Sequence, residues 1–308
     1  MTTAVVFAYS EVGYRCLQVL LRHAVTIPLV FSHQDDPHET RWYGDVTQLA
    51  RSHGLEVVTP DDPGASPWLE RVENTRPDFI FSFYYRHLLS DKLLRTARRA
   101  ALNMHGSLLP KYRGRAPVNW ALVHGETETG VSLHAMERRP DAGALYGQQA
   151  IAISLNDTAL DVSLRLAQAA AQLLDRCWPD LEAGRIEPKA LDLANGSYYG
   201  RRRPEDGRID WHQPTLSVHN LIRAVAPPFP GAFCVVRDRT LRFTGSFFQD
   251  QRALHPSLAP CVYVEQGGFY ADGIDGKRIE VTGLESNAEP VSTERFLSMF
   301  GDAPLALL

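Results

Sequence analysis

Residues 100–110 read AALNMHGSLLP, an apolar, strand-like run that stops at a turn containing Gly and Pro. Open α/β sheets bind their ligands at the edge where the parallel strands end. Asn103 and His105 are two residues apart on the extended part, so both side chains project to the same face. The stretch therefore predicts a strand that carries an amide donor and a base to one edge of a sheet.

Upstream of this stretch, strand-like and helix-like segments alternate along the chain. This pattern is typical of a parallel sheet with helices on both faces, so the predicted fold class is α/β. Ser90 is the expected N-cap of the helix that directly precedes residue 100. Strands are expected at 4–8, 27–31, 55–59, 78–84 and 100–104, and helices at 12–22, 44–52, 68–73 and 91–99.

Downstream, a loop rich in Pro, Gly and Arg at 106–117 leads to a helix at 118–124 and to strands at 130–136 and 145–153. A long helix is expected to start at Thr158, with Asn156 or Asp157 as its cap. Apolar residues at helical spacing on this helix are expected to pack in the core. They are Leu160, Leu164, Ala167, Ala171 and Leu174.

The composition changes near residue 200, which predicts a catalytic domain at 1–200 and a second domain at 201–308. Short β-like runs separated by Gly and Pro at 233–236, 240–244, 260–264, 268–271 and 278–281 predict a small β-barrel or sandwich. Three aromatic residues of this part, Trp211, Phe229 and Phe233, are expected to pack at the domain junction, with stacking on a nucleobase as the alternative.

Composition excludes several classes of function. The 308 residues are 44% hydrophobic and 22% charged, and the formal net charge of −4 argues against a nucleic acid as the main partner. The four cysteines form no CxxC pair, and His33 with His38, or His212 with His219, lacks partners at metal-ligand spacing. No signal peptide or membrane-length apolar run is evident, so a cytoplasmic protein without metal or membrane partner is expected.

The residues that end the central strand suit acyl transfer. Asn103 can donate to a developing oxyanion, and His105 can take a proton from an attacking amine. Asp141, in the turn-like stretch RRPDAG at 138–143, would orient His105 if it lay nearby, or would only support its own turn. The sequence has no GxGxxG after the first strand, no phosphate-binding GxxxxGK[ST] loop and no GxSxG elbow.

The pattern Asn103-x-His105-x-Ser-Leu-Leu-Pro-x-x-Arg-Gly, followed by Asp141-x-Gly, resembles the signature of the 10-formyltetrahydrofolate-dependent formyltransferases. Within that family the sequence is most similar to the UDP-4-amino-4-deoxy-L-arabinose formyltransferase domain of the bifunctional polymyxin-resistance enzyme. Further matching stretches lie at 81–88, 108–117, 125–131 and 199–202. The resemblance implies a Rossmann-like core and a small C-terminal OB-like β-barrel.

The resemblance also implies the roles of individual residues. Asn103, His105 and Asp141 match the catalytic residues, and 10-formyltetrahydrofolate would be the co-substrate. The folate would be held by residues of two loops: His87, Leu88 and Leu89, and Glu137, Arg138, Arg139, Pro140 and Asp141. Contacts to a nucleotide-linked sugar would come from Arg115, Arg201 and Arg202. Lipid A modification, polymyxin resistance and a homo-oligomer follow as expectations.

Alternatives to this acceptor stay open at the level of sequence. The bifunctional relative carries a decarboxylase domain that is not expected in this protein, Pro140 replaces a small residue, and the region from Gly245 diverges most. A dTDP- or GDP-linked amino sugar, methionyl-tRNA, or water in a formyltetrahydrofolate hydrolase could each accept the formyl group. The stretch 31–39 is short and acidic, which disfavours tRNA. A binding module without turnover is the non-enzymatic alternative.

Overall fold

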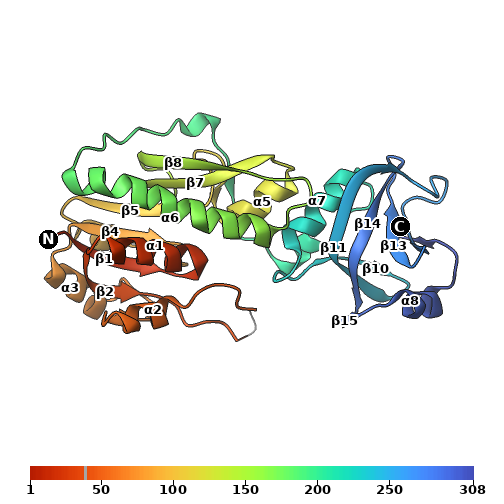
Figure 1. Ribbon diagram of the computed structural model, residues 1–308, viewed down its shortest axis with the longest axis horizontal. Coiled ribbons are helices and arrows are strands. Elements are labelled where there is room, and N and C mark those ends of the chain that lie inside the picture. Colours follow the sequence, from red (N-terminus) through yellow and green to blue (C-terminus); the bar gives the residue numbers. More distant parts are fainter. Residues whose placement is uncertain (38–39) are drawn as a thin grey trace. The chain divides into compact units, whose positions relative to one another are not determined.

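The computed structural model describes residues 1–37 and 40–308, so His38 and Glu39 lie outside the described residues (Figure 1). The chain forms two compact units. The first unit consists of Met1–Pro117, Glu128–Ala152 and Ser163–Gly200, and the second of Val118–Thr127, Ile153–Val162 and Arg201–Leu308. Two short segments before residue 200 thus belong to the second unit, and the division at residue 200 into separately folding domains stays a prediction.

A seven-stranded sheet forms the centre of the first unit, in the order β3-β2-β1-β4-β5-β7-β8. The strands from β3 to β5 in this order pair in parallel, whereas β7 runs antiparallel to both β5 and β8. This parallel-rich sheet confirms the predicted α/β class. The strands are β1 (Thr3–Ala8), β2 (Thr26–Phe31), β3 (Val57–Val58), β4 (Phe79–Phe83), β5 (Ala100–His105), β7 (Glu128–Ala135) and β8 (Leu145–Ala152).

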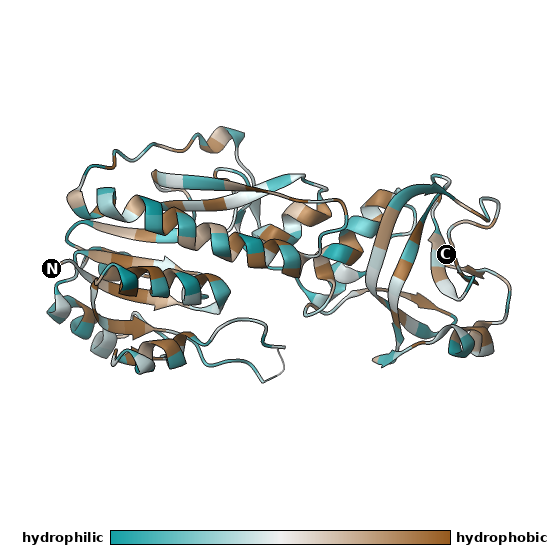
Figure 2. Cartoon of the chain, in the orientation of Figure 1, coloured by the Kyte–Doolittle hydropathy of each residue, from teal (hydrophilic) through white to brown (hydrophobic). Residues whose placement is uncertain are grey.

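Helices cover both faces of this sheet, which explains why its inner strands are nearly continuous apolar runs (Figure 2). On one face, the rings of Phe79 and Phe81 lie 5.9 and 6.1 Å from Trp178 of α6. On the other face, Ile80 belongs to a buried cluster with Val72 of α3. The helices of residues 1–200 are α1 (Ser10–Arg22), α2 (Val46–Ser52), α3 (Ser66–Thr75), α4 (Asp91–Leu94), α5 (Pro117–Val123) and α6 (Ala159–Ala183).

The helix predicted after Ser90 is shorter than expected. Ser90 caps it, because its hydroxyl accepts the backbone N–H of Leu93 at 3.4 Å, but the helix ends at Leu94. The chain then turns because the backbone N–H groups of Arg98 and Arg99 donate to carbonyls just before β4. Tertiary hydrogen bonds have replaced the helical ones at the end of the predicted segment.

The start of the long helix α6 corrects the predicted cap. Thr158 caps the helix reciprocally with Asp161: the Thr158 hydroxyl accepts the Asp161 N–H at 3.3 Å, and the Asp161 carboxylate accepts the Thr158 N–H at 2.9 Å. The predicted caps Asn156 and Asp157 were wrong. Asn156 instead pairs with the backbone of Phe248 through both ends of its amide.

The predicted apolar stripe of α6 is only partly correct. Ala167 and Leu174 are buried, but Leu164 is 39% exposed. This helix is rich in alanine and apolar around most of its circumference, so the sequence left its buried face ambiguous. The buried positions are Ala159, Val162, Leu166, Ala167, Ala169, Ala170, Leu173, Leu174, Trp178 and Leu181.

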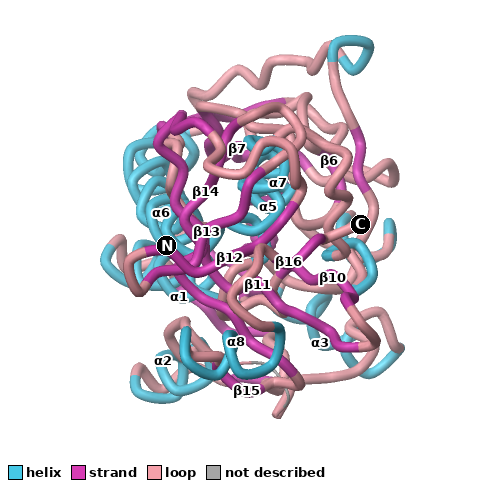
Figure 3. The backbone as a smooth tube through the Cα atoms, turned by 90° about the vertical axis from the view of Figure 1, so that its right-hand side faces the viewer, coloured by secondary structure: helices cyan, strands magenta, loops and turns pink. Residues whose placement is uncertain are grey.

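The second unit is built on a curved antiparallel sheet in the order β10-β11-β14-β13-β12-β16, with β15 paired to β14 (Figure 3). Its apolar core lies between this sheet and two helices, and it confirms the predicted C-terminal β-rich part. The elements are β10 (Ala232–Val236), β11 (Arg239–Arg252), β12 (Cys261–Glu265), β13 (Gly268–Asp272), β14 (Lys277–Ser286), β15 (Glu289–Pro290), β16 (Leu305–Ala306), α7 (Thr215–Val225) and α8 (Thr293–Phe300).

Two glycines face each other where β11 and β14 bend. Gly245 pairs with Gly283, and the register shifts on both sides of this pair. A Cβ atom at Gly283 would lie 2.3 Å from the hydroxyl of Thr244, and one at Gly245 would lie 2.5 Å from that of Thr282. The bend lets both strands continue well beyond the predicted segments 240–244 and 278–281.

The helices α7 and α8 were not predicted, because their segments are short and contain His, Arg or Glu between the apolar positions. Each buries an apolar face in the core of the second unit, with Ile222 from α7 and Phe296 from α8. Trp211 belongs to the same core, 4% exposed, with its ring 5.4 Å from Phe243. Trp211 therefore packs inside this unit, as favoured over nucleobase stacking, and its burial excludes stacking on a base.

Arg223 of α7 is expected to stabilise the second unit. It is 3% exposed; its Nε donates to Asn220 at 2.9 Å, and its Nη1 donates to the carbonyls of Ser154 and Asp157, both at 3.1 Å. Arg223→Met should lower the free energy of unfolding by about 1–3 kcal/mol, since it removes all three bonds. Urea denaturation measures this loss, with the exposed Arg185→Met as control. Equal midpoints for both variants would contradict it.

Candidate active site

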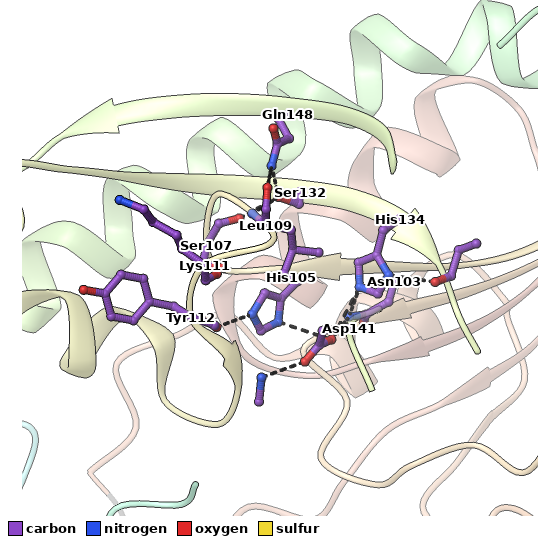
Figure 4. Close-up of polar contacts among 12 residues, drawn as sticks. Asn103, His105, Ser107, Leu109, Lys111, Tyr112, Ser132, His134, Asp141 and Gln148 are labelled. Atoms are coloured by element: carbon purple, nitrogen blue, oxygen red, sulfur yellow. Dashed lines mark hydrogen bonds and ion pairs between the residues drawn. The ribbon is translucent and has the colours of Figure 1, made fainter. Parts of the chain in front are cut away.

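Two neighbouring strands and one loop bring four polar side chains together. Asn103 and His105 lie on β5 and project to the same face, as their spacing predicted. His134 on β7 stands directly opposite Asn103 in the antiparallel register. Asp141 belongs to the loop that joins β7 to β8. Figure 4 shows these side chains converging at the end of β5.

Asp141 is the shared partner of the group. Its Oδ1 lies 3.5 Å from Nδ2 of Asn103, 3.5 Å from Nδ1 of His105 and 3.4 Å from Nε2 of His134. Its Oδ2 accepts the backbone N–H of Gly114 at 2.9 Å. The side chain of Asp141 is only 12% exposed. The structure thus brings together the three residues predicted to be catalytic and adds His134 to them.

The local backbone explains how Asp141 reaches this position. Its φ of +52° lies in the left-handed region, which Asp tolerates better than most residues. Two glycines permit the close approaches around it. A Cβ atom at Gly143 would lie 2.2 Å from the carbonyl oxygen of Ala135, and one at Gly114 would lie 2.2 Å from that of Tyr199. The Asp141 carboxylate therefore points at the site, and the alternative of mere turn support does not describe its contacts.

The contacts of His105 define which ring nitrogen carries the proton. Its Nε2 lies 2.8 Å from the backbone carbonyl oxygen of Tyr112, and a carbonyl only accepts hydrogen bonds. Nε2 is therefore the protonated nitrogen of the neutral ring. Nδ1, the other nitrogen, faces Asp141 and carries the lone pair. His105 thus presents Nδ1 as its basic atom.

His134 orients the amide of Asn103. Nδ1 of His134 donates to the carbonyl oxygen of Ala135 at 2.7 Å, and its Nε2 lies 3.1 Å from Nδ2 of Asn103. Sequence reasoning missed this residue. Its signal was the pair of polar residues Ser132 and His134, two apart on one face of an otherwise apolar strand.

The loop after His105 is anchored by polar side chains of β7 and β8 (Figure 4). The hydroxyl of Ser132 donates to the carbonyl of Ser107 at 2.6 Å and accepts the backbone N–H of Leu109 at 3.0 Å. Gln148 donates to the carbonyl of Leu109 at 2.8 Å. Ser107 and Ser132 are completely buried. These bonds fix the chain directly beyond β5.

A family model described as formyl transferase matches residues 15–177, just over half of the chain. The chain belongs to the formyl transferase family. A second model, that of the formyl transferase C-terminal domain, matches residues 202–298 of this formyltransferase. The family assignment confirms the resemblance seen in the sequence and makes this protein an enzyme of formyl transfer.

Solved structures share the fold of this formyltransferase. The N-formyltransferase from Helicobacter canadensis, in complex with folinic acid and dTDP-3-aminofucose, has a TM-score of 0.75 at 19% identity, covering 91% of this chain and 99% of that one. The sugar 3N-formyl transferase WlaRD, with dTDP and 5-N-formyl-THF, has a TM-score of 0.74 at 18% identity, with coverages of 94% and 99%. HypX from Aquifex aeolicus, in complex with tetrahydrofolic acid, has a TM-score of 0.65 at 16% identity, covering 96% of this chain and 46% of that one.

Two further properties concern residues 1–37 and 40–308. Within these residues, no group of three or more His, Cys, Asp or Glu side chains is arranged to hold a metal ion. No helix among the same residues is both long and apolar enough to span a bilayer.

The protonation states follow from burial and from the neighbouring charges. Burial lowers the pKa of His105 below its usual 6.5, although the charge of Asp141 and the carbonyl of Tyr112 act in the opposite direction. Burial alone would raise the pKa of Asp141, but His105, His134 and the N–H of Gly114 together hold it well below its usual range. Near neutral pH the site therefore holds an ionised Asp141 beside a neutral His105.

The loop with His87, Leu88 and Leu89 follows β4 and is fixed by a histidine of the neighbouring segment after β2. Nε2 of His33 accepts the backbone N–H of Arg86 at 2.9 Å, and the ring of His33 stacks 4.9 Å from that of His87. Burial, with His87 and Arg86 nearby, lowers the pKa of His33 to about 4, so it stays an acceptor near neutral pH. Leu88 is 74% exposed, which leaves an apolar surface on this loop.

The second loop predicted to contact folate enters the site through one residue. Glu137, Arg138 and Arg139 are exposed and Pro140 is half-buried, whereas Asp141 turns inward. The structure therefore brings only Asp141 of this loop to Asn103 and His105. The others remain candidates for contacts with a bound ligand.

The three arginines predicted to bind the sugar nucleotide are placed differently. Arg115 of the first unit donates to the carbonyl of Arg86 at 2.9 Å, next to the loop with His87. Arg202 of the second unit lies 4.7 Å from the ring centre of Trp120 and donates to the carbonyl of Asp206 at 2.8 Å. Arg201 is an exposed residue of the second unit. Arg202 is thus already engaged, whereas Arg201 presents its side chain to solvent.

A cavity of 260 Å³ lies where β1 and β2 end, and sequence reasoning did not find it. Residues such as Tyr9, Ser10 and Tyr43 line it, whereas Asn103, His105 and Asp141 do not. Two arginines, Arg41 and Arg51, and two aspartates line it, and Arg41 pairs with the aspartates Asp35 at 3.2 Å and Asp45 at 3.3 Å. The cavity is therefore polar but balanced in charge.

Proposed function

We propose that this formyltransferase moves the formyl group of 10-formyltetrahydrofolate to the amino group of a nucleotide-linked amino sugar. The convergence of Asn103, His105 and Asp141 at the end of β5 carries the proposal, because it supplies a donor, a base and an orienting carboxylate. Relatives of the same fold support the ligand classes: the Helicobacter canadensis enzyme was solved with folinic acid and dTDP-3-aminofucose, and WlaRD with dTDP and 5-N-formyl-THF.

In the proposed mechanism the sugar amine attacks the formyl carbon, which the folate supplies. Asn103 donates to the oxygen that becomes negatively charged as the new bond forms. Nδ1 of His105 takes a proton from the amine, and the ring, now positive, gains an Nδ1–H that faces the Asp141 carboxylate. When the bond to the folate nitrogen breaks, His105 returns that proton to the departing nitrogen. Asp141 stabilises the positive ring throughout.

The residues predicted to hold the folate fit a flat, partly polar molecule. The loop with His87, Leu88 and Leu89 is anchored through Arg86, and its exposed Leu88 offers an apolar contact surface. Its backbone groups would hold the pterin. Glu137, Arg138, Arg139 and Pro140, which precede Asp141, would border the same ligand.

The acceptor that we propose to test first is UDP-4-amino-4-deoxy-L-arabinose, from the sequence resemblance. Its formylation would belong to lipid A modification and polymyxin resistance. Arg115, Arg201 and Arg202 are proposed contacts to its phosphates, because guanidinium groups bind such oxygens in pairs. A dTDP-linked amino sugar is the second candidate, favoured by the ligands of the two sugar formyltransferases of the same fold.

A panel of nucleotide amino sugars decides between these acceptors. The protein is incubated with 10-formyltetrahydrofolate and each UDP-, dTDP- or GDP-linked amino sugar, or with methionyl-tRNA, and products are scored by mass for one added formyl group. One sugar should be formylated far faster than the rest, and His105→Asn protein controls for uncatalysed transfer. Formate without a formylated sugar would identify a hydrolase, and formylation of methionyl-tRNA alone would move the acceptor to nucleic acid.

A further inference from the structure

A segment distant in sequence braces the loop that follows His105. We call residues 196–199 the brace; they include β9 (Tyr198–Tyr199), which pairs in parallel with β6 (Arg113–Gly114). Three backbone bonds join the two segments: from the N–H of Ser197 to the carbonyl of Pro110 at 3.2 Å, from Arg113 to Ser197 at 3.0 Å, and from Arg115 to Tyr199 at 2.9 Å. Both segments belong to the first unit.

Tyr112 is held by the brace on several sides. The hydroxyl of Ser197 accepts the backbone N–H of Tyr112 at 2.8 Å, and the ring of Tyr112 stacks on that of Tyr199 at 5.3 Å. Tyr112 is 7% exposed and has a φ of +56°, a left-handed conformation that a non-glycine residue keeps only when its surroundings hold it. The brace therefore fixes the peptide groups on both sides of this residue.

The approach of the brace is close enough to require glycine on both segments. A Cβ atom at Gly196 would lie 2.5 Å from the carbonyl oxygen of Pro110, and one at Gly114 would lie 2.2 Å from that of Tyr199. Gly114 also donates its N–H to Asp141 at 2.9 Å. The loop thus carries two contacts to the catalytic group: its Tyr112 carbonyl binds His105, and its Gly114 N–H binds Asp141.

We propose that Ser197 is a positioning residue for formyl transfer: by holding Tyr112 it keeps the proton of neutral His105 on Nε2 and leaves Nδ1 free as the base. The predicted effect on kcat rests on the proposed function, whereas the predicted effect on the His105 tautomer does not. Without the Ser197 hydroxyl, the peptide before Tyr112 loses its anchor, and the Tyr112 carbonyl is held less firmly against Nε2, although the backbone bond from Arg113 to Ser197 remains. His105 can then place its proton on either nitrogen, and the Nδ1–H form directs no lone pair at the amine.

The tautomer of His105 tests this directly in the whole protein, without any substrate. Nitrogen-15 NMR of histidine-labelled protein distinguishes the two neutral forms, and His105→Asn assigns the signals. The parent protein should show only the Nε2–H form, and Ser197→Ala a mixture of both. Ser197→Thr and Ser197→Val form a matched pair of equal shape. The threonine variant should restore the Nε2–H form and the valine variant should not.

Kinetics provide the second readout, with the acceptor found in the panel. Ser197→Ala should lower kcat about tenfold with little change in either KM, as expected for loss of one positioning bond. His105 is faced by Asp141, by His134 and by the Tyr112 carbonyl, and the carbonyl raises its pKa. The acid limb of the kcat profile should therefore shift to lower pH. Ser66→Ala, which loses one exposed hydrogen bond to Glu70, should leave kcat and the position of the acid limb unchanged.

Two results would overturn the inference. One is a Ser197→Val protein in which His105 keeps the pure Nε2–H form. The other is a Ser197→Ala protein whose kcat falls only in proportion to its loss of folded material, with an unshifted acid limb. If no nucleotide sugar is formylated, the proposed function fails, yet the NMR result still decides the role of Ser197.

Discussion

Replacing His105 with asparagine is expected to lower kcat for formyl transfer about 10²–10⁴-fold, the usual contribution of a general base. Asparagine is polar and smaller than histidine, so the fold should persist, but its amide cannot take a proton at neutral pH. Single-turnover assays with saturating 10-formyltetrahydrofolate and the best acceptor measure the chemical step. KM for both substrates should change little, because the ring acts on the reacting amine.

The matched control for this variant is His53→Asn, which changes an exposed histidine at the end of α2. It should transfer formyl groups at the parental rate. Retention of more than a tenth of the parental rate by His105→Asn would assign the base to another group. His134 would then be the next residue to test, since its Nε2 lies 3.4 Å from the same carboxylate oxygen.

Asp141→Asn is expected to lower kcat about 10²-fold or more, because the positive ring formed during catalysis loses its counter-charge. The amide oxygen can still accept the N–H of Gly114, so the loop should keep its place. The variant therefore separates the charge of Asp141 from its structural bond. Thermal unfolding should show a small change in Tm beside the large change in rate.

The pH profile of the same variant gives a signed prediction. His105 must be neutral to act as a base, so activity falls as pH drops through its pKa, which lies below 6.5. The negative charge of Asp141 raises that pKa, and its removal should move the acid limb to lower pH. An acid limb that keeps its position in Asp141→Asn, or that moves to higher pH, would mean that Asp141 does not act on His105 through charge. Asp175→Asn, a surface change on α6, is the control.

Much of the candidate site could be predicted because it depends on local rules. Alternation along one strand places Asn103 and His105 on one face, and the end of a parallel strand is a functional edge in any open α/β sheet. Asp141 could be proposed as a partner only from the family pattern, since spacing alone left turn support equally open. Its left-handed φ and its contact with Gly114 depend on tertiary structure.

His134 and Ser197 show what the sequence could not provide. His134 meets Asn103 only because β7 runs antiparallel to β5 in one particular register, and a shift by one residue would turn it to the opposite face. Ser197 is 85 residues from Tyr112 and lies in a segment with almost no regular structure. Neither periodicity nor propensity reports such contacts, because both describe only neighbours along the chain.

The second unit shows a similar limit to prediction from sequence. Its strands were located by short β-like runs, but their lengths depend on the facing glycines Gly245 and Gly283, which let the sheet bend and continue. The start of α6 likewise depended on which polar residue was left free for capping. Asn156 was occupied by Phe248 of a distant strand, and Thr158 took the cap.

The brace also changes where the catalytic part of this chain ends. The formyl transferase model stops at residue 177, and every predicted catalytic residue lies before that point. Yet the segment that holds Tyr112 and borders Gly114 consists of residues 196–199, which lie beyond residue 177. A fragment cut at the end of the recognised segment would keep all the predicted catalytic side chains and lose the support that arranges them. For truncation or grafting, the smallest working piece is therefore longer than the piece by which the family is recognised.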